Sequence, residues 1–119
     1  MNMGRTVTMA IALVFMKVAP SLGDFTDGNF LLSTCDRTDQ AGAAYCIGYI
    51  VAVADSLAEG EPVPTRDGTG VFRACVPVGA TSTQVKDVAV KWLRENPRER
   101  HLGAWSLVAA AIGQAFPCR

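Results

Sequence analysis

The apolar stretch from Ala43 to Leu57 predicts a helix around which the rest of the chain is organised. One face of this helix would carry apolar residues at helical spacing, namely Ile47, Ile50, Val51, Ala54, Leu57 and Ala58. A second apolar face would carry Tyr45, Tyr49, Ala52 and Val53. Because it is apolar on two sides, this helix is expected to lie between neighbours, in a bundle or at a subunit contact.

The pattern of polar and apolar residues predicts one helix before the central one and another after it. The first would follow a cap at Thr26 or Asp27 and end near Cys35. The later helix would begin at a capping box formed by Thr81 and Gln84 and continue to about residue 95. Its inner face would consist of Val85, Val88, Ala89, Trp92 and Leu93.

A fourth helix is predicted to begin at Asn96 and Pro97, because asparagine is a good cap and proline suits the first helical turn. Glu99 would complete a second capping box, and Pro117 would prevent the helix from continuing. Residues 61–70 hold two prolines and two glycines among charged residues, which predicts a surface loop. Since no stretch shows the sustained alternation of a strand, the predicted fold class is all-α, a compact four-helix bundle.

The first residues predict a secretory signal peptide rather than a part of the fold. A positive charge at Arg5 precedes a short apolar run, residues 6–19, that is broken only by Lys17. The run is shorter than the roughly 20 residues that a comfortable membrane span needs. A small-x-small pattern at residues 21–23 places the cut before Asp24. The chain is therefore divided into a signal peptide, 1–23, and a single domain, 24–119, with a retained N-terminal anchor as the alternative.

Removing 23 of the 119 residues leaves 96, enough for one small domain. The basic count falls from 11 to 9 against 11 acidic residues, so the net charge becomes −2. This balance gives no electrostatic basis for binding nucleic acid or an anionic membrane. Four cysteines remain, and an even number in a short exported chain predicts two disulfides in a periplasmic or extracellular space.

Four cysteines allow three pairings. If the four cysteine-bearing helix ends meet at one pole of an antiparallel bundle, the preferred pairing is Cys46–Cys75 with Cys35–Cys118. The alternative is Cys35–Cys46 with Cys75–Cys118. The absence of a Cys-x-x-Cys motif argues against a zinc site and against a thioredoxin-like redox role.

The sequence offers no credible catalytic pair. His101 is the only histidine, and pairing of all cysteines would leave no thiol for it to activate. Asp55 is expected at the exposed end of the central helix. No metal, cofactor or enzymatic activity is predicted. A charged stretch could be either a solvated turn or a contact for a protein partner, and it comprises Asn96, Arg98, Glu99, Arg100 and His101.

Seven short segments carry a family resemblance: GNFLLSTC (28–35), CIGYIVAVAD (46–55), CVP (75–77), TQV (83–85), WL (92–93), NPRERH (96–101) and AFPC (115–118). In order and spacing they resemble the Rap/Tai family, small periplasmic immunity proteins of the bacterial type VI secretion system. The resemblance implies an all-helical, disulfide-bonded and commonly dimeric protein.

By the same resemblance, the chain would be a periplasmic immunity protein that binds a peptidoglycan amidase effector and inhibits it sterically. Residues 96–101 are the first choice for the segment that plugs the effector's cleft, and residues 61–70 are the second. The alternative function is that of a small periplasmic acid-stress chaperone, a helical protein without an effector partner.

Overall fold

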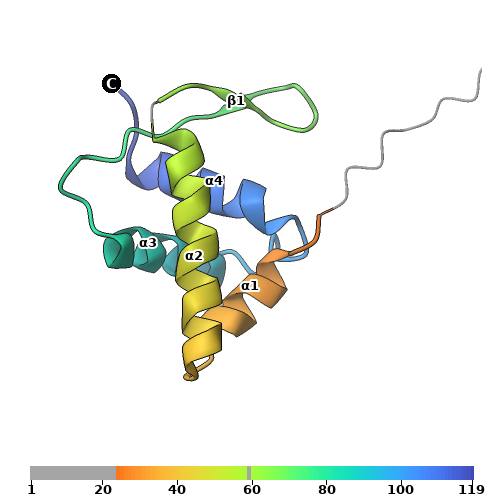
Figure 1. Ribbon diagram of the computed structural model, residues 1–119. Helices are drawn as coiled ribbons and strands as arrows, with labels where there is room; N and C mark the ends of the chain where they lie inside the picture. Colours follow the sequence, from red (N-terminus) through yellow and green to blue (C-terminus); the bar gives the residue numbers. More distant parts are fainter. Residues whose placement is uncertain (1–23, 59) are drawn as a thin grey trace, which may run out of the picture.

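The computed structural model describes residues 24–58 and 60–119, so the predicted signal peptide lies outside the described residues. Within these ranges the chain forms four helices and one antiparallel pair of two-residue strands (Figure 1). In chain order the elements are α1 (Gly28–Cys35), α2 (Gln40–Leu57), β1 (Val63–Pro64), β2 (Val71–Phe72), α3 (Ser82–Glu95) and α4 (Ala104–Ala115).

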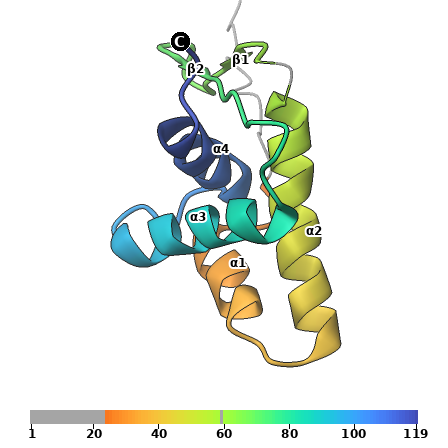
Figure 2. The same ribbon diagram turned by 90° about the vertical axis from the view of Figure 1, so that its left-hand side faces the viewer.

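The central helix α2 is buried on one side only. Its buried residues include Cys46, Ile50, Val53 and Leu57, which face the other helices. Figure 2 shows α1, α3 and α4 gathered on the same side of α2. The opposite side is exposed and carries mainly small residues, among them Ala44, Gly48, Ala52 and Ser56. The prediction that α2 lies between neighbours on two sides is therefore not met within a single chain.

The starts of the first three helices follow side-chain caps. Asp27 caps α1 by accepting a hydrogen bond from Phe30 N at 2.8 Å, as predicted. The predicted capping box of α3 is formed by both of its hydrogen bonds. Helix α2 begins three residues before Ala43, because Asp39 accepts a hydrogen bond from Gly42 N and starts the helix at Gln40.

The predicted start of the fourth helix at Asn96 and Pro97 is wrong. Residues 97–101 form turns, and α4 begins only at Ala104. Asn96 instead ends α3, and its side-chain amide donates to Trp92 O at 2.8 Å. The chain turns here because the segment before α4 pairs with the start of α1: Ala104 N donates to Thr26 O at 2.8 Å.

The core is filled by aliphatic side chains from all four helices. Its fully buried members include Leu31, Ile50, Leu57, Leu93, Val108 and Ile112. Burial of one such side chain contributes about 1.5–3 kcal/mol relative to leaving it in water. Trp92 and Trp105 pack against this core while remaining partly exposed, and Trp92 Nε1 joins α3 to α4 through a 3.2 Å bond to Gln114 Oε1.

The fold class needs one amendment, because the predicted loop 61–70 includes part of a β-hairpin. Val63 pairs with Phe72 and Pro64 with Val71, and Thr65 N donates to Gly70 O at 2.9 Å. Strands of two residues are too short to give an alternating pattern, so the sequence did not reveal them. The molecule is a helical bundle with a small two-stranded sheet, not a purely all-α protein.

All four cysteines are paired, as Cys35–Cys46 and Cys75–Cys118. The preferred pairing, Cys46–Cys75 with Cys35–Cys118, is wrong, and the alternative is correct. The assumption of a common pole fails because Cys75 lies well before α3. There its N–H donates to Phe116 O at 2.8 Å, which brings the C-terminal segment and Cys118 beside it.

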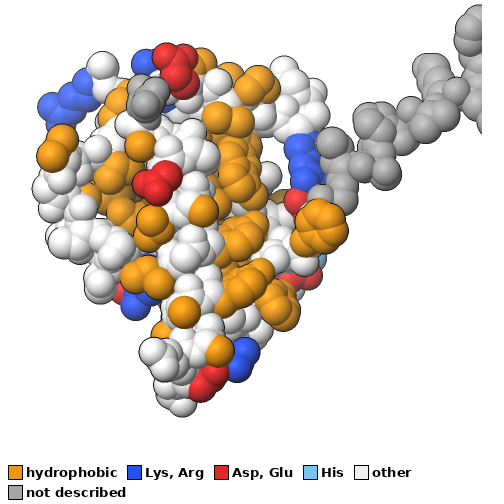
Figure 3. Space-filling model, viewed as in Figure 1, with side chains coloured by type: hydrophobic (Ala, Val, Ile, Leu, Met, Phe, Trp, Pro, Cys, Tyr) orange, Lys and Arg blue, Asp and Glu red, His pale blue; other side chains and the backbone are white. Residues whose placement is uncertain are grey.

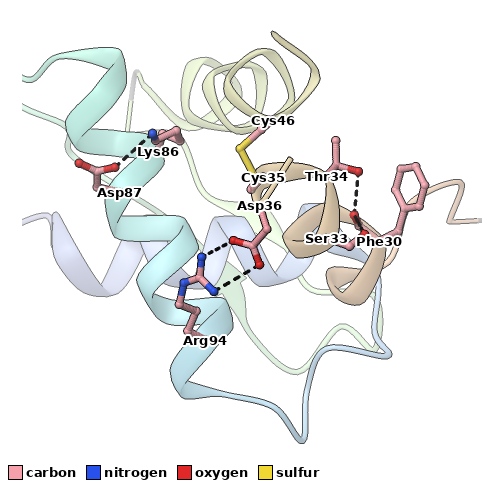
Figure 4. The surroundings of a disulfide bond; sticks show 9 residues. All are labelled: Phe30, Ser33, Thr34, Cys35, Asp36, Cys46, Lys86, Asp87 and Arg94. Carbon is pink, nitrogen blue, oxygen red and sulfur yellow. Dashed lines mark hydrogen bonds and ion pairs between the residues drawn. A yellow bond between two sulfur atoms is a disulfide. The ribbon is translucent and has the colours of Figure 1, made fainter. Parts of the chain in front are cut away.

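The other disulfide joins the last residue of α1 to the first half of α2 (Figure 4). Beside it, the guanidinium of Arg94 on α3 contacts both carboxylate oxygens of Asp36, one of them at 3.3 Å. This ion pair raises the pKa of Arg94. The end of α1 is thus fixed to α2 by a covalent bond and to α3 by an ion pair.

Candidate partner-binding groove

Two segments proposed separately from the sequence line one groove of about 470 Å³. The first is the hairpin tip, residues 65–70, which connects β1 to β2. The second is the corner, residues 96–103, which connects α3 to α4. Figure 1 shows the hairpin extending over α4 toward the start of the described chain. The groove is lined by Asp24, Thr65, Arg66, Asp67, His101, Leu102, Gly103 and Ser106.

Asp24 connects the two sides of the groove. Its carboxylate forms an ion pair with the guanidinium of Arg66 on the hairpin tip. The same carboxylate covers Gly103 so closely that a Cβ placed on this glycine would lie 2.5 Å from Asp24 Cγ. A side chain at Gly103 would therefore push the Asp24 carboxylate aside and disturb its ion pair with Arg66.

The corner is held in place by the start of α1. Gly28 N donates to Leu102 O at 3.0 Å, and Asn29 N donates to Arg100 O at 2.9 Å. These two N–H groups have no partner within their own helix, so the corner carbonyls satisfy them. A Cβ on Gly28 would lie 2.5 Å from Leu107 Cδ1 and 2.9 Å from Arg100 O, which explains the need for glycine.

The hairpin tip is ordered by the carboxylate of Asp67. Its Oδ1 accepts bonds from Thr65 Oγ1 at 2.7 Å, Thr69 Oγ1 at 2.8 Å and Thr69 N at 3.1 Å. These donors favour the charged form and lower the pKa of Asp67 to about 2. Gly68 completes the turn with a φ of 70°, in the left-handed region that glycine adopts without strain.

The five residues predicted to bind a partner occupy different positions in the corner. His101 is exposed and lines the groove, while Arg98 and Glu99 are exposed beside it. Asn96 is half-buried and bonds to Trp92 O. Arg100 is half-buried, its carbonyl holds α1, and its Nε is buried without a hydrogen-bond partner among the described residues.

Sequence reasoning missed several residues that line the groove. Asp24, Leu102, Gly103 and Ser106 were not named as candidates. Asp24 and Arg66 are 42 positions apart, and no local pattern links them. Leu102 carried one usable signal, since a leucine within a charged, turn-forming stretch has little chance of burial; it is 44% exposed.

An aromatic ridge, consisting of Phe30, Tyr45 and Tyr49, lies on the neighbouring surface of α1 and α2. The centroids of Phe30 and Tyr45 are 5.8 Å apart, and those of Tyr45 and Tyr49 are 6.1 Å apart. The Tyr45 hydroxyl lies 2.8 Å from Thr26 Oγ1. Burial raises the pKa of Tyr49, with smaller contributions from Tyr45 and Asp24. Figure 3 shows a band of hydrophobic surface along this side of α2.

Two kinds of feature are not found in the described part of the chain. Within residues 24–58 and 60–119, there is no group of three or more histidine, cysteine, aspartate or glutamate side chains that could hold a metal ion. No helix in the same ranges has both the length and the apolarity to cross a membrane.

A family model of Rap1a immunity proteins matches residues 27–118, which include all four helices, both disulfides, the hairpin tip and the corner. The chain belongs to the Rap1a immunity protein family. This membership confirms the resemblance to the Rap/Tai type VI immunity proteins and points to a role as a type VI effector immunity protein. Asp24 lies outside the part that matches Rap1a. Comparison with curated proteins and with solved structures finds no significant match.

Proposed function

We propose that the chain is a periplasmic immunity protein that binds a type VI peptidoglycan amidase effector and blocks its active site sterically. The observation that carries this proposal is the Rap1a match over residues 27–118, which includes both segments that line the groove. The proposal includes export, with residues 1–23 as a cleaved signal peptide and residues 24–119 as the mature domain.

The groove suits inhibition because its two walls are already ordered. The hairpin tip is fixed by the bonds of Asp67, and the corner is fixed by the N-terminus of α1. Segments that are rigid before binding lose little conformational entropy in a complex, which favours high affinity. Such an inhibitor needs no catalytic group, and pairing of all four cysteines leaves no thiol for His101 to activate. The proposed protein is not an enzyme and uses no cofactor.

Among the predicted contact residues, we expect two roles. Arg98, Glu99 and His101 project from the corner and would touch the effector. Asn96 and Arg100 would act by holding the corner in shape, since their polar groups bond to Trp92 O and Asn29 N. Arg66 and Leu102 join the first group because both line the groove, and arginine is among the residues that contribute most to binding at protein interfaces.

The proposal also includes a homodimer formed through the exposed side of α2. No charged residue occurs in α2 before Asp55, although Ala44, Gly48 and Ala52 face solvent in the single chain. Small residues let two helices approach closely, so Ala52→Arg should separate the dimer. Sedimentation velocity of the wild type and the variant tests this, and a wild type that sediments as a monomer at 100 μM or so would contradict it.

The decisive experiment expresses the chain in the periplasm together with candidate type VI amidase effectors, one at a time. Protection from lysis and recovery of a complex are expected, with loss of amidase activity when both proteins are purified. If none of the candidate amidases forms a complex and no lysis is prevented, the proposal fails.

A single substitution tests the groove. Leu102→Asp places a charge on the exposed leucine of the corner and should weaken effector binding about tenfold or more, because a hot-spot contact contributes 2 kcal/mol or so. Val78→Asp is the matched control, since Val78 is also an exposed aliphatic residue but does not line the groove. Calorimetric titration compares the two; equal affinities would place the contact elsewhere.

A further inference from the structure

The groove alone is small for a stable complex between two proteins. Eight residues line it, and three of them are the charged residues Asp24, Arg66 and Asp67. Each side of a stable protein–protein interface contributes about 20–30 residues. The centre of such an interface is depleted of charged residues and enriched in aromatic ones. A complex that uses the groove therefore has to extend onto an apolar surface beside it.

Such a surface adjoins the groove at Asp24. It consists of Phe25, which follows Asp24 directly and is fully exposed, and of the aromatic ridge, in which Phe30 and Tyr45 are also exposed. Figure 3 shows hydrophobic side chains both beside the start of the described chain and along α2. Helix α1 contains no charged residue, and α2 contains none before Asp55. Neither helix therefore places a charge within this surface.

The groove and the aromatic ridge are joined by direct bonds near the start of α1. The Thr26 hydroxyl lies 2.8 Å from the Tyr45 hydroxyl of the ridge. Asn29, the residue before Phe30, donates its N–H to Arg100 O in the corner at 2.9 Å. Because these bonds hold the corner and the ridge in one arrangement, a partner that reaches the corner can also meet the ridge with little ordering cost.

We propose that Phe25 and the aromatic ridge form the main apolar contact with the effector, and that the groove forms the charged rim of the same interface. This inference rests on the proposed function, because it concerns the same partner. The occupant is the effector rather than a second copy of the chain, since Phe25 and Phe30 lie outside α2, the helix proposed to form the dimer. The matching surface of the effector would be apolar at its centre and polar at its edge.

Three variants test this proposal: Phe25→Ala, Phe30→Ala and, as the control, Val78→Ala. Phe25 and Val78 are matched in exposure, at 104% and 107%, and Val78 does not line the groove. Since a fully exposed ring supports no packing, Phe25→Ala should leave the fold unchanged, and it decides the test if Phe30→Ala does not fold. Circular dichroism and thermal midpoints establish the folding of each variant. Each variant is then titrated with an amidase that forms a complex with the wild type.

Phe25→Ala and Phe30→Ala should each bind about tenfold more weakly than the wild type, whereas Val78→Ala should bind equally well. If Phe25→Ala binds as tightly as Val78→Ala, the inference is overturned while the proposed function stands. Sedimentation velocity of each variant alone is the second readout. A shift toward monomer that the control does not show would assign the surface to a second copy of the chain, which also overturns the inference. If no amidase binds the wild type, the proposed function fails, and the inference fails with it.

Discussion

The two disulfides stabilise parts of the molecule that are built differently. Cys35–Cys46 closes a loop across 11 positions between two core helices, and Cys46 is only 2% exposed. Cys75–Cys118 closes a loop across 43 positions and lies outside the core, with Cys75 exposed. The helical part is held mainly by buried apolar contacts, whereas the part that carries the hairpin adds a cross-link and polar bonds to the packing of Phe72 against Trp105.

This difference matters because the groove uses both parts. Its corner is bonded to the start of α1, and its hairpin ends shortly before Cys75, which the second disulfide ties to the C-terminal segment. Loss of one disulfide should therefore affect one wall more than the other.

Removal of the disulfides gives the largest expected effect. In the chain-entropy description, a loop of 43 residues contributes about 4 kcal/mol to the free energy of unfolding and one of 11 residues about 3 kcal/mol. Cys75→Ala with Cys118→Ala should thus lower stability more than Cys35→Ala with Cys46→Ala. Guanidinium unfolding measures both. Only the loss of Cys75–Cys118 should also weaken effector binding. If the loss of Cys35–Cys46 lowers the free energy of unfolding more, or weakens binding more, the two disulfides do not act as described.

Two glycines in the helical part provide the next test. Gly28→Ala should lower the free energy of unfolding by about 1–3 kcal/mol, because the new methyl group would meet Leu107 Cδ1 and the carbonyl of Arg100. Gly48→Ala is the control, since no atom lies within 4 Å of a Cβ at that position. It should raise stability by up to about 1 kcal/mol through helix propensity. Thermal unfolding compares them; similar shifts would mean that α1 does not fit tightly against the corner.

The smallest effect concerns the pH dependence of the hairpin tip. The folded-state pKa of Asp67, about 2, lies below its ordinary value of 3.8. Its contribution is therefore fully present above pH 4 or so and is lost as the pH falls toward about 2. The amide resonance of Thr69 should shift over that range in a nuclear magnetic resonance titration. Asp67→Asn should abolish this titration, while the resonances of α2 residues should not follow it.

Local signals predicted the starts of α1 and α3, but they placed the start of α2 three residues late and the start of α4 at the wrong position. Thr81 and Gln84 form the capping box that their spacing predicts, whereas Asn96 and Glu99 have a similar spacing and do not. The difference is tertiary. The corner carbonyls of Arg100 and Leu102 are required by the first N–H groups of α1, so the chain forms turns where a helix was predicted. A local pattern cannot show that a distant helix needs those carbonyls.

The groove was predictable only in pieces. Turn-forming residues at 61–70 and charges at 96–101 marked both segments as surface features, and both line the groove. Their meeting depends on Asp24, a residue whose sequence surroundings suggested only the end of a leader. The cysteine count likewise predicted two disulfides, but their pairing depended on a C-terminal segment that returns to Cys75.

The corner is attached to α1 through main-chain atoms, since Gly28 N and Asn29 N bond to carbonyls rather than to side chains. Substitutions at Arg98, Glu99 or His101 would therefore leave those bonds in place. The proposed recognition surface can therefore acquire new specificity by point mutation while the scaffold beneath it keeps its shape. An immunity protein that must keep pace with a changing toxin gains evolutionary freedom from this arrangement.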